Sequence, residues 1–117
     1  MGIHTPKKAH ITTHILNLEM GKPASNVAVN LYSEHASDPI AKGVTDSDGR
    51  ILQWDNEFEI AAGHYRLQFA VGAWYAQQKL TSFYPEISIQ FTVASVQEHY
   101  HVPLLLNAFG YSTYRGS

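Results

Sequence analysis

The 117-residue sequence contains no cysteine, has few charged residues and has no long apolar run. The absence of cysteine excludes disulfides and thiolate chemistry, and it implies no particular redox compartment. Charged residues make up 15% of the chain, and the net charge is -2. We therefore expect no surface for nucleic acid or for an anionic membrane. A charged fraction below the usual value of about 25% indicates that a partner subunit covers part of the surface.

No segment is long enough to span a bilayer. Lys7 and Lys8 precede the first predicted strand, but no apolar segment of a signal peptide follows them. We therefore expect a cytoplasmic protein, with a periplasmic or other compartment if a targeting segment has been removed. The length fits one domain, which we place at residues 10–117 after a flexible N-terminal arm at residues 1–9.

Short stretches of alternating polar and apolar residues predict β-strands along most of the chain. Turn residues separate the stretches, and helical spacing of Trp74, Gln77 and Gln78 predicts one short helix at residues 72–80. This pattern predicts an all-β fold, a β-sandwich of two antiparallel sheets. The predicted strands are residues 10–17, 27–32, 40–45, 51–54, 64–71, 87–93, 99–106 and 111–114.

The last of the long strands carries two histidines. Alternation places His99 and His101 on one face, two residue rises or roughly 6.7 Å apart. Tyr100, Val102 and Leu104 occupy the opposite face, which is apolar. We expect this apolar face to pack in the core while the imidazoles face a cleft or an interface.

Histidine is the main chemical signal of the sequence, which contains seven of them. Any one such residue is more often a structural or surface histidine than a catalytic one. The alternative is general acid–base catalysis, since imidazole titrates near neutral pH, and His14 and His101 are the candidates. Arg50 ends a tight turn at residues 46–50; it is either a solvated turn residue or a guanidinium that binds a carbonyl-rich ligand.

The His99-x-His101 spacing also occurs in zinc sites, where His14, Glu98 or Asp46 would have to supply a third ligand. Spacing alone favours acid–base use over zinc. The sequence has no Gly-x-Ser-x-Gly motif and no phosphate-binding glycine loop, which disfavours a serine hydrolase and a nucleotide-binding protein.

Six segments carry a resemblance to a known family: Thr13–Asn17, Gly21–Ala24, Thr45–Arg50, Phe83–Ile87, His99–Leu106 and Gly110–Ser117. From about Ile11 to the last residue, the sequence resembles the transthyretin-like family, in its 5-hydroxyisourate hydrolase branch. The closing Tyr-Arg-Gly-Ser, residues 114–117, is the most specific part, because it separates the hydrolases from the thyroid-hormone carriers of the same fold.

This resemblance implies a transthyretin-like β-sandwich of two four-stranded antiparallel sheets with one short α-helix. It also implies a homotetramer, built as a dimer of dimers, whose active sites lie in a channel between the dimers. The implied reaction belongs to urate and purine degradation: hydrolysis of 5-hydroxyisourate to 2-oxo-4-hydroxy-4-carboxy-5-ureidoimidazoline, with no metal or organic cofactor.

The family motifs also imply the site residues. The catalytic residues are His14, Arg50, His101 and Ser117, and the substrate-binding residues are Arg50, Tyr114, Arg115 and Gly116. One imidazole takes a proton from the attacking water, and the other orients the water or protonates the leaving nitrogen. Two alternatives remain: a non-catalytic transthyretin-like carrier of a small ligand, and a zinc-binding β-sandwich.

Overall fold

The computed structural model describes residues 9–117 of the chain. The N-terminal arm predicted at residues 1–9 lies outside the described residues except for Ala9, whose N–H donates to the Leu52 carbonyl at 2.9 Å. No helix within residues 9–117 has the length and apolar character needed to cross a membrane.

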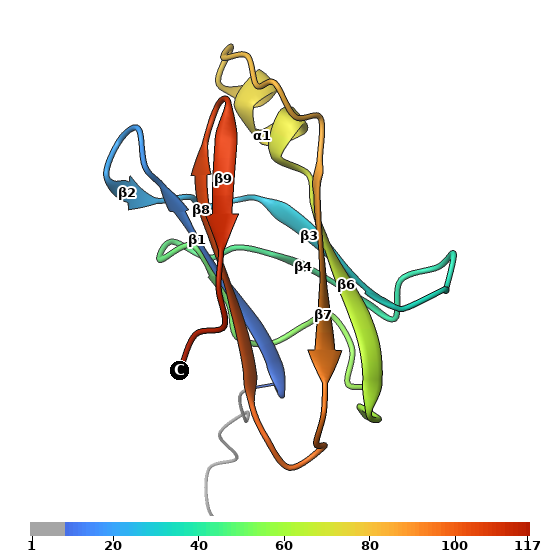
Figure 1. The fold of residues 1–117 in the computed structure, drawn as a ribbon. Coiled ribbons are helices and arrows are strands. Elements are labelled where there is room, and N and C mark those ends of the chain that lie inside the picture. Colours follow the sequence, from blue (N-terminus) through green and yellow to red (C-terminus); the bar gives the residue numbers. More distant parts are fainter. Residues whose placement is uncertain (1–8) are drawn as a thin grey trace, which may run out of the picture.

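Two β-sheets pack face to face, and one short helix lies at one end of the sandwich (Figure 1). The strands follow the predicted alternating stretches, with boundaries shifted by one or two residues for most of them. The elements are β1 (Ile11–Asn17), β2 (Lys22–Pro23), β3 (Ala28–Ser33), β4 (Ala41–Val44), β5 (Arg50–Ile51), β6 (Gly63–Phe69), α1 (Val71–Gln77), β7 (Ile87–Val93), β8 (Tyr100–Asn107) and β9 (Gly110–Thr113).

The first sheet has the strand order β2-β1-β8-β9, and the short strand β5 pairs with β1 as well. The second sheet has the order β4-β3-β6-β7. This architecture confirms the predicted β-sandwich with one short helix.

Two details differ from the prediction of two four-stranded antiparallel sheets. The first sheet has five strands, because the two-residue strand β2 was not among those predicted, and strands β1 and β8 run parallel, with Ile11 opposite Tyr100 and Asn17 opposite Leu106. Side chains alternate in parallel and antiparallel strands alike, so alternation does not indicate direction. The connection from β1 to β8 passes through the whole second sheet rather than through a hairpin, and it leaves the direction unconstrained.

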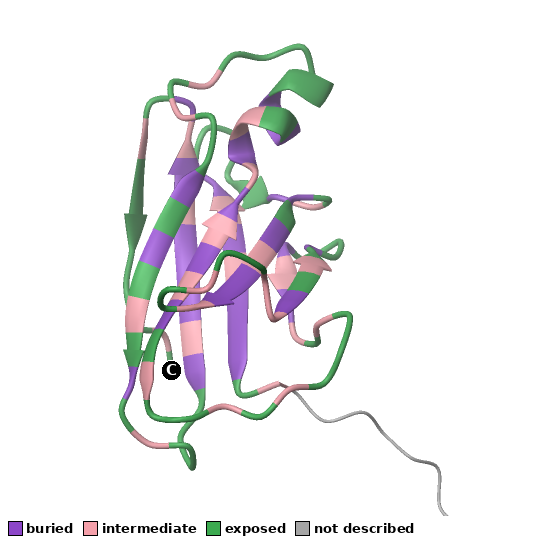
Figure 2. Cartoon of the chain, turned by 90° about the vertical axis from the view of Figure 1, so that its right-hand side faces the viewer, coloured by how far each residue is buried: buried purple, intermediate pink, exposed green. Residues whose placement is uncertain are grey.

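The core fills the space between the two sheets. Ile15, Leu31, Leu67, Phe69 and Leu104 are all 0% exposed, and they come from strands of both sheets. Burial of each such side chain contributes about 1.5–3 kcal/mol relative to its exposure. Figure 2 shows buried residues alternating with exposed or half-buried ones along the strands. The predicted inward face of the last long strand is buried: Tyr100 is 3% exposed, Val102 6% and Leu104 0%.

Helix α1 ends earlier than the predicted range of 72–80, at Gln77. Lys79 has a φ of 60°, in the left-handed region, and the Leu80 N–H donates back to the Tyr75 carbonyl at 3.0 Å. This geometry is a Schellman motif, which terminates the helix. Trp74 and Tyr75 pack the short helix against the core.

Candidate active site

The register between β1 and β8 places the two candidate imidazoles on the outer face of the first sheet. Thr12 is opposite His101, and His14 is opposite Pro103. Paired residues of adjacent strands point to the same face, and so do residues two apart on one strand. His14 and His101 are therefore neighbours on this face, and both are half-buried.

Arg50 reaches the same face through the tight turn that precedes β5. The Asp46 carboxylate accepts hydrogen bonds from the Asp48 and Arg50 N–H groups at 2.8 and 3.0 Å. Gly49 has a φ of 73°, and a Cβ at this position would lie 2.5 Å from the Ile15 carbonyl oxygen. The glycine lets the turn approach β1 closely, and the resulting register places Arg50 opposite His14.

Burial lowers the pKa of His14 below its usual value of 6.5, and the positive charge of Arg50 lowers it further. A hydrogen bond to the Asp48 backbone and the charges of Asp46 and Asp48 act in the opposite direction without cancelling the decrease. His14 is therefore mainly neutral at pH 7, which is the form of imidazole that accepts a proton.

The C-terminal tail lies against His101. The Gly116 N–H donates to the His101 carbonyl at 2.8 Å, so the tail pairs with β8 beyond the end of β9. A Cβ on residue 116 would lie 2.5 Å from His101 Cδ2 and 3.2 Å from Pro103 Cγ. The position therefore requires glycine because of close packing, and the chain end is held beside a candidate catalytic ring.

The pairing of the tail with β8 is interrupted between the end of β9 at Thr113 and the pairing of Gly116 with His101, and Pro103 accounts for this interruption. Alternate residues of β8 face the tail, and Pro103 is the next of these after His101, but proline has no N–H to donate. The Thr113 hydroxyl donates to the Pro103 carbonyl at 2.7 Å, so the carbonyl is satisfied at the gap. The pairing resumes at Gly116 in the same register.

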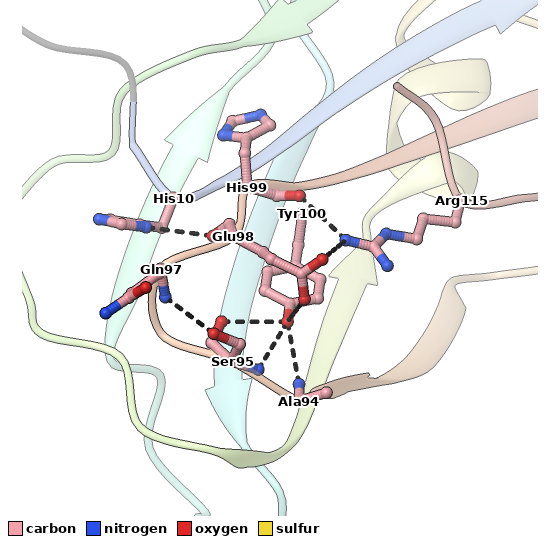
Figure 3. Close-up of polar contacts among 8 residues, drawn as sticks. All are labelled: His10, Ala94, Ser95, Gln97, Glu98, His99, Tyr100 and Arg115. Atoms are coloured by element: carbon pink, nitrogen blue, oxygen red, sulfur yellow. Dashed lines mark hydrogen bonds and ion pairs between the residues drawn. The ribbon is translucent and has the colours of Figure 1, made fainter.

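Arg115 is directed to the opposite side of the tail from Gly116. Its guanidinium lies 4.6 Å from the centre of the Tyr100 ring, and its Nη2 is 3.7 Å from Glu98 Oε1. The same nitrogen donates to the His99 carbonyl at 3.3 Å (Figure 3). These contacts attach the tail to the start of β8.

The residue that receives Arg115 is itself held firmly. The Tyr100 hydroxyl accepts from the Ala94 and Ser95 N–H groups, both at 2.9 Å, and it lies 3.2 Å from Glu98 Oε2 (Figure 3). Tyr100 is 3% exposed. The fixed Tyr100 ring and the neighbouring Glu98 carboxylate thus bind the Arg115 guanidinium.

The structure brings four of the predicted site residues together on one face: His14, Arg50, His101 and Gly116. Tyr114 and Ser117 are exposed residues of the same tail. Arg115, predicted to bind substrate, has its guanidinium at Tyr100 and Glu98.

Sequence reasoning missed Thr12, whose hydroxyl lies 2.8 Å from His101 Nδ1 and 3.0 Å from His99 Nε2. A threonine in a β-branched strand is ordinary, and its type alone carries no signal. The available signal was its position, since alternation placed Thr12 on the same face as His14.

The zinc interpretation lacks a set of ligands in the structure. Within residues 9–117, no group of three or more His, Cys, Asp or Glu side chains is arranged to hold a metal ion. Acid–base chemistry at a polar outer face is what the arrangement supports.

Comparison with known proteins gives the same family for nearly the whole chain. The sequence model of the HIUase/Transthyretin family matches residues 11–116. The 5-hydroxyisourate hydrolase of Salmonella typhimurium is 44% identical over 109 residues, which cover 92% of this chain and 80% of that protein. The 5-hydroxyisourate hydrolase of Caulobacter vibrioides is 40% identical over 92% of this chain and 97% of its own length.

Solved structures from both branches of the family superimpose on the fold. Klebsiella pneumoniae 5-hydroxyisourate hydrolase has a TM-score of 0.80 at 36% identity, covering 92% of each chain. Sea bream transthyretin in complex with thyroxine has a TM-score of 0.83 at 31% identity, covering 92% of this chain and 95% of the other. The β-sandwich, the matching segments and these relatives together establish that the chain belongs to the HIUase/Transthyretin family.

Proposed function

We propose that the protein hydrolyses 5-hydroxyisourate to 2-oxo-4-hydroxy-4-carboxy-5-ureidoimidazoline, a step of urate degradation. The observation that carries the proposal is the register of the first sheet, which aligns His14 with Arg50 and sets His101 beside them. Relatives over 92% of the chain bear the name 5-hydroxyisourate hydrolase.

The chemistry requires a base, an electrophilic stabiliser and a bound water. One imidazole, His14 or His101, removes a proton from the water as its oxygen attacks the ring carbonyl carbon. Arg50 binds the carbonyl oxygen as negative charge develops on it, a type of contribution worth about 3 kcal/mol where it has been measured. The other imidazole orients the water or protonates the nitrogen of the acyl carbon–nitrogen bond that breaks.

The low pKa of His14 fits this mechanism. Burial and Arg50 both disfavour the imidazolium form of His14, so the ring is available as a proton acceptor at neutral pH. The arginine thus has two effects in the proposal: it stabilises the oxyanion and keeps its neighbour neutral.

The tail has two roles in the proposal. Tyr114, Gly116 and Ser117 complete the substrate site, with Ser117 acting through its hydroxyl or its terminal carboxylate. The contacts of Arg115 with Tyr100 and Glu98 favour a role in holding the tail in place, in addition to or instead of the predicted contact with substrate.

A small-ligand carrier is the second candidate, favoured by the similarity to sea bream transthyretin. A carrier of an apolar aromatic ligand has no use for an arginine and two imidazoles at the binding face. A coupled assay separates the two functions: urate oxidase and urate are supplied with and without the purified, untagged protein. Faster decay of 5-hydroxyisourate absorbance supports the hydrolase, whereas an unchanged decay contradicts it.

The family relationship indicates an oligomer, and we propose that it is a homotetramer formed as a dimer of dimers. Strands β7 and β9 are the edges of their sheets, and a hollow of about 220 Å³ lies between β7 and the tail. Edge strands offer unpaired backbone groups to a second copy.

Large apolar side chains are also exposed in three connecting segments, where a second copy could cover them. Met20 is 64% exposed, Phe83 70% and Phe109 73%. Native mass spectrometry tests the assembly: four times the 13.1 kDa chain mass is expected, and a monomer or a dimer would contradict it.

The cytoplasmic location stays a prediction, which fractionation of source cells would test.

A further inference from the structure

Thr12 lies between His99 and His101 on the outer face of the first sheet, and its side chain contacts both imidazoles. Its hydroxyl oxygen is 2.8 Å from His101 Nδ1 and 3.0 Å from His99 Nε2. The residue is 1% exposed, so its contacts with the two rings are shielded from solvent. We propose that Thr12 is a positioning residue that holds His101 in the tautomer with a proton on Nδ1 and none on Nε2, an inference that rests on the proposed hydrolase function.

A hydroxyl group has a single proton to donate. Two arrangements use Thr12 as donor in one contact and acceptor in the other. If Thr12 donates to His101 Nδ1, His101 carries its proton on Nε2. If Thr12 donates to His99 Nε2, His101 donates its Nδ1–H to Thr12, and its Nε2 is unprotonated.

The orientation of the His101 ring decides which nitrogen can meet the substrate. Nδ1 faces Thr12, and Cδ2 lies against Gly116, where a Cβ would approach to 2.5 Å. Both atoms are bonded to Cγ, so Nε2 lies on the far edge of the ring, away from the strand. Only an unprotonated Nε2 can remove a proton from the attacking water.

The second arrangement also needs no rearrangement during the reaction. The proton of the attacking water moves to His101 Nε2 while the water oxygen bonds to the carbonyl carbon. The resulting imidazolium keeps its Nδ1–H bond to Thr12. The Nε2 proton then passes to the ring nitrogen as the acyl carbon–nitrogen bond breaks, which restores neutral His101.

His99 completes the arrangement from the solvent side. It is exposed, and Figure 3 shows its ring pointing away from the side of the strand on which Tyr100 and Arg115 meet. In the second arrangement its Nε2, 3.0 Å from the Thr12 oxygen, accepts the Thr12 proton and turns it away from His101. In this scheme Thr12 and His99 act through His101 rather than on the substrate.

The test compares Thr12→Val, which removes the hydroxyl at nearly constant shape, with Thr12→Ser, which keeps the hydroxyl. Thr13→Val is the matched control, because Thr13 is the next residue and is 0% exposed. Its hydroxyl donates to the Val102 carbonyl at 2.7 Å, on the side of β1 away from the imidazoles. Thr13→Val therefore reports the cost of losing a buried hydroxyl without touching a histidine.

In the coupled assay, kcat of Thr12→Val should fall about 10- to 100-fold, within the range of acid–base effects. Its KM should stay within about threefold, since the substrate contacts remain. Thr12→Ser should recover most of kcat, and Thr13→Val should lose stability but keep the kcat of the wild type. The proposal would be overturned if Thr12→Ser lost as much kcat as Thr12→Val. It would also be overturned if Thr13→Val lost as much kcat as Thr12→Val.

Nitrogen-15 NMR of the histidine rings gives a second readout that a purely structural role would not move. The full chain is labelled, and His101 is assigned from the spectrum of His101→Asn. We expect the Nδ1–H tautomer for His101 in the wild type and in Thr12→Ser, and a loss of that preference in Thr12→Val. An Nε2–H tautomer in the wild type, or no change in Thr12→Val, would refute the inference.

The two proposals can fail separately. The tautomer is measured without substrate, so it decides the role of Thr12 even if the wild type proves inactive in the coupled assay. Conversely, an active wild type with an unchanged spectrum in Thr12→Val would leave the hydrolase function standing and remove the role of Thr12.

Discussion

Gly116→Ala tests whether the C-terminal tail is part of the active site. The added methyl would lie 2.5 Å from His101 Cδ2 and 3.2 Å from Pro103 Cγ. The first distance is about 1 Å shorter than the optimal separation of two carbon atoms. Gly116 does not have a positive φ, so alanine adds only this steric conflict.

The conflict can be relieved only by movement of the tail or of the His101 ring. A displacement of about 1 Å at a catalytic group can cost on the order of 100-fold in rate. We therefore expect kcat/KM of Gly116→Ala to fall about 10- to 100-fold in the coupled urate oxidase assay. The melting temperature should change little, because the tail lies at the edge of a sheet and its loss leaves the core intact.

Gly110→Ala is the matched control for this prediction. Gly110 is the first residue of β9, and an added Cβ there would find only Asn107 Oδ1, at 3.7 Å. This variant should retain the activity of the wild type. If Gly116→Ala is as active as Gly110→Ala, then the packing of the tail on His101 has no part in catalysis and the reasoning fails.

Three further predictions concern the face and its anchor. His101→Asn should abolish hydrolysis without changing the oligomeric state seen by native mass spectrometry; near-normal turnover would contradict its role. Wild-type activity should persist at pH 6.5 and decline only below it, because the pKa of His14 is lowered, and Arg50→Gln should move this decline to higher pH by removing a charge that lowers the pKa; a pH profile of the residual activity that did not shift would count against a catalytic role for neutral His14, whether it takes the proton or orients the water. Arg115→Gln should reduce kcat/KM while leaving the melting temperature nearly unchanged, since exposed ion pairs contribute little to stability; full activity would show that the tail needs no anchor at Tyr100.

The same shift in pKa has a consequence for folding. The unfolded chain binds a proton at His14 more readily than the folded chain does, since the folded pKa lies below the usual value. The folded state is therefore favoured above pH 6.5 and loses this contribution as the pH falls through the folded pKa. His14→Gln should reduce the dependence of the melting temperature on pH in this range, as measured by calorimetry.

Much of the fold could be predicted from alternation, because burial of one face of each strand is written into the order of side chains. The same signal predicted that His101 lies on the other face of its strand from Tyr100 and Val102, and in the structure these two neighbours are buried. Strand direction could not be predicted this way, and the parallel pairing of β1 with β8 appeared only in the structure. Direction depends on how distant segments meet, which no local pattern encodes.

The site shows the same division. The turn at residues 46–50 left Arg50 as either a solvated residue or a ligand-binding guanidinium, and the pairing of β5 with β1 is what places it, half-buried, opposite His14. The contact of Gly116 with His101 joins residues at the two ends of the last hairpin, and spacing does not reveal it. Thr12 could not be picked out for a further reason: its type is common in strands, and only its contacts with two imidazoles point to the positioning role proposed for it.

The division between the faces of β1 also explains how one fold can serve a hydrolase and a carrier. Ile11, Thr13 and Ile15 are all 0% exposed and pack in the core, whereas Thr12 and His14 belong to the outer face. Successive residues of a strand point to opposite faces, so an outward residue can change while the core residues beside it stay the same. The sandwich shared with sea bream transthyretin therefore constrains the inward positions, and the chemistry is set by the outward ones. A polar row of His14, Arg50 and His101 on that outer face is the feature by which this member of the family is expected to act on its ligand rather than only to bind it.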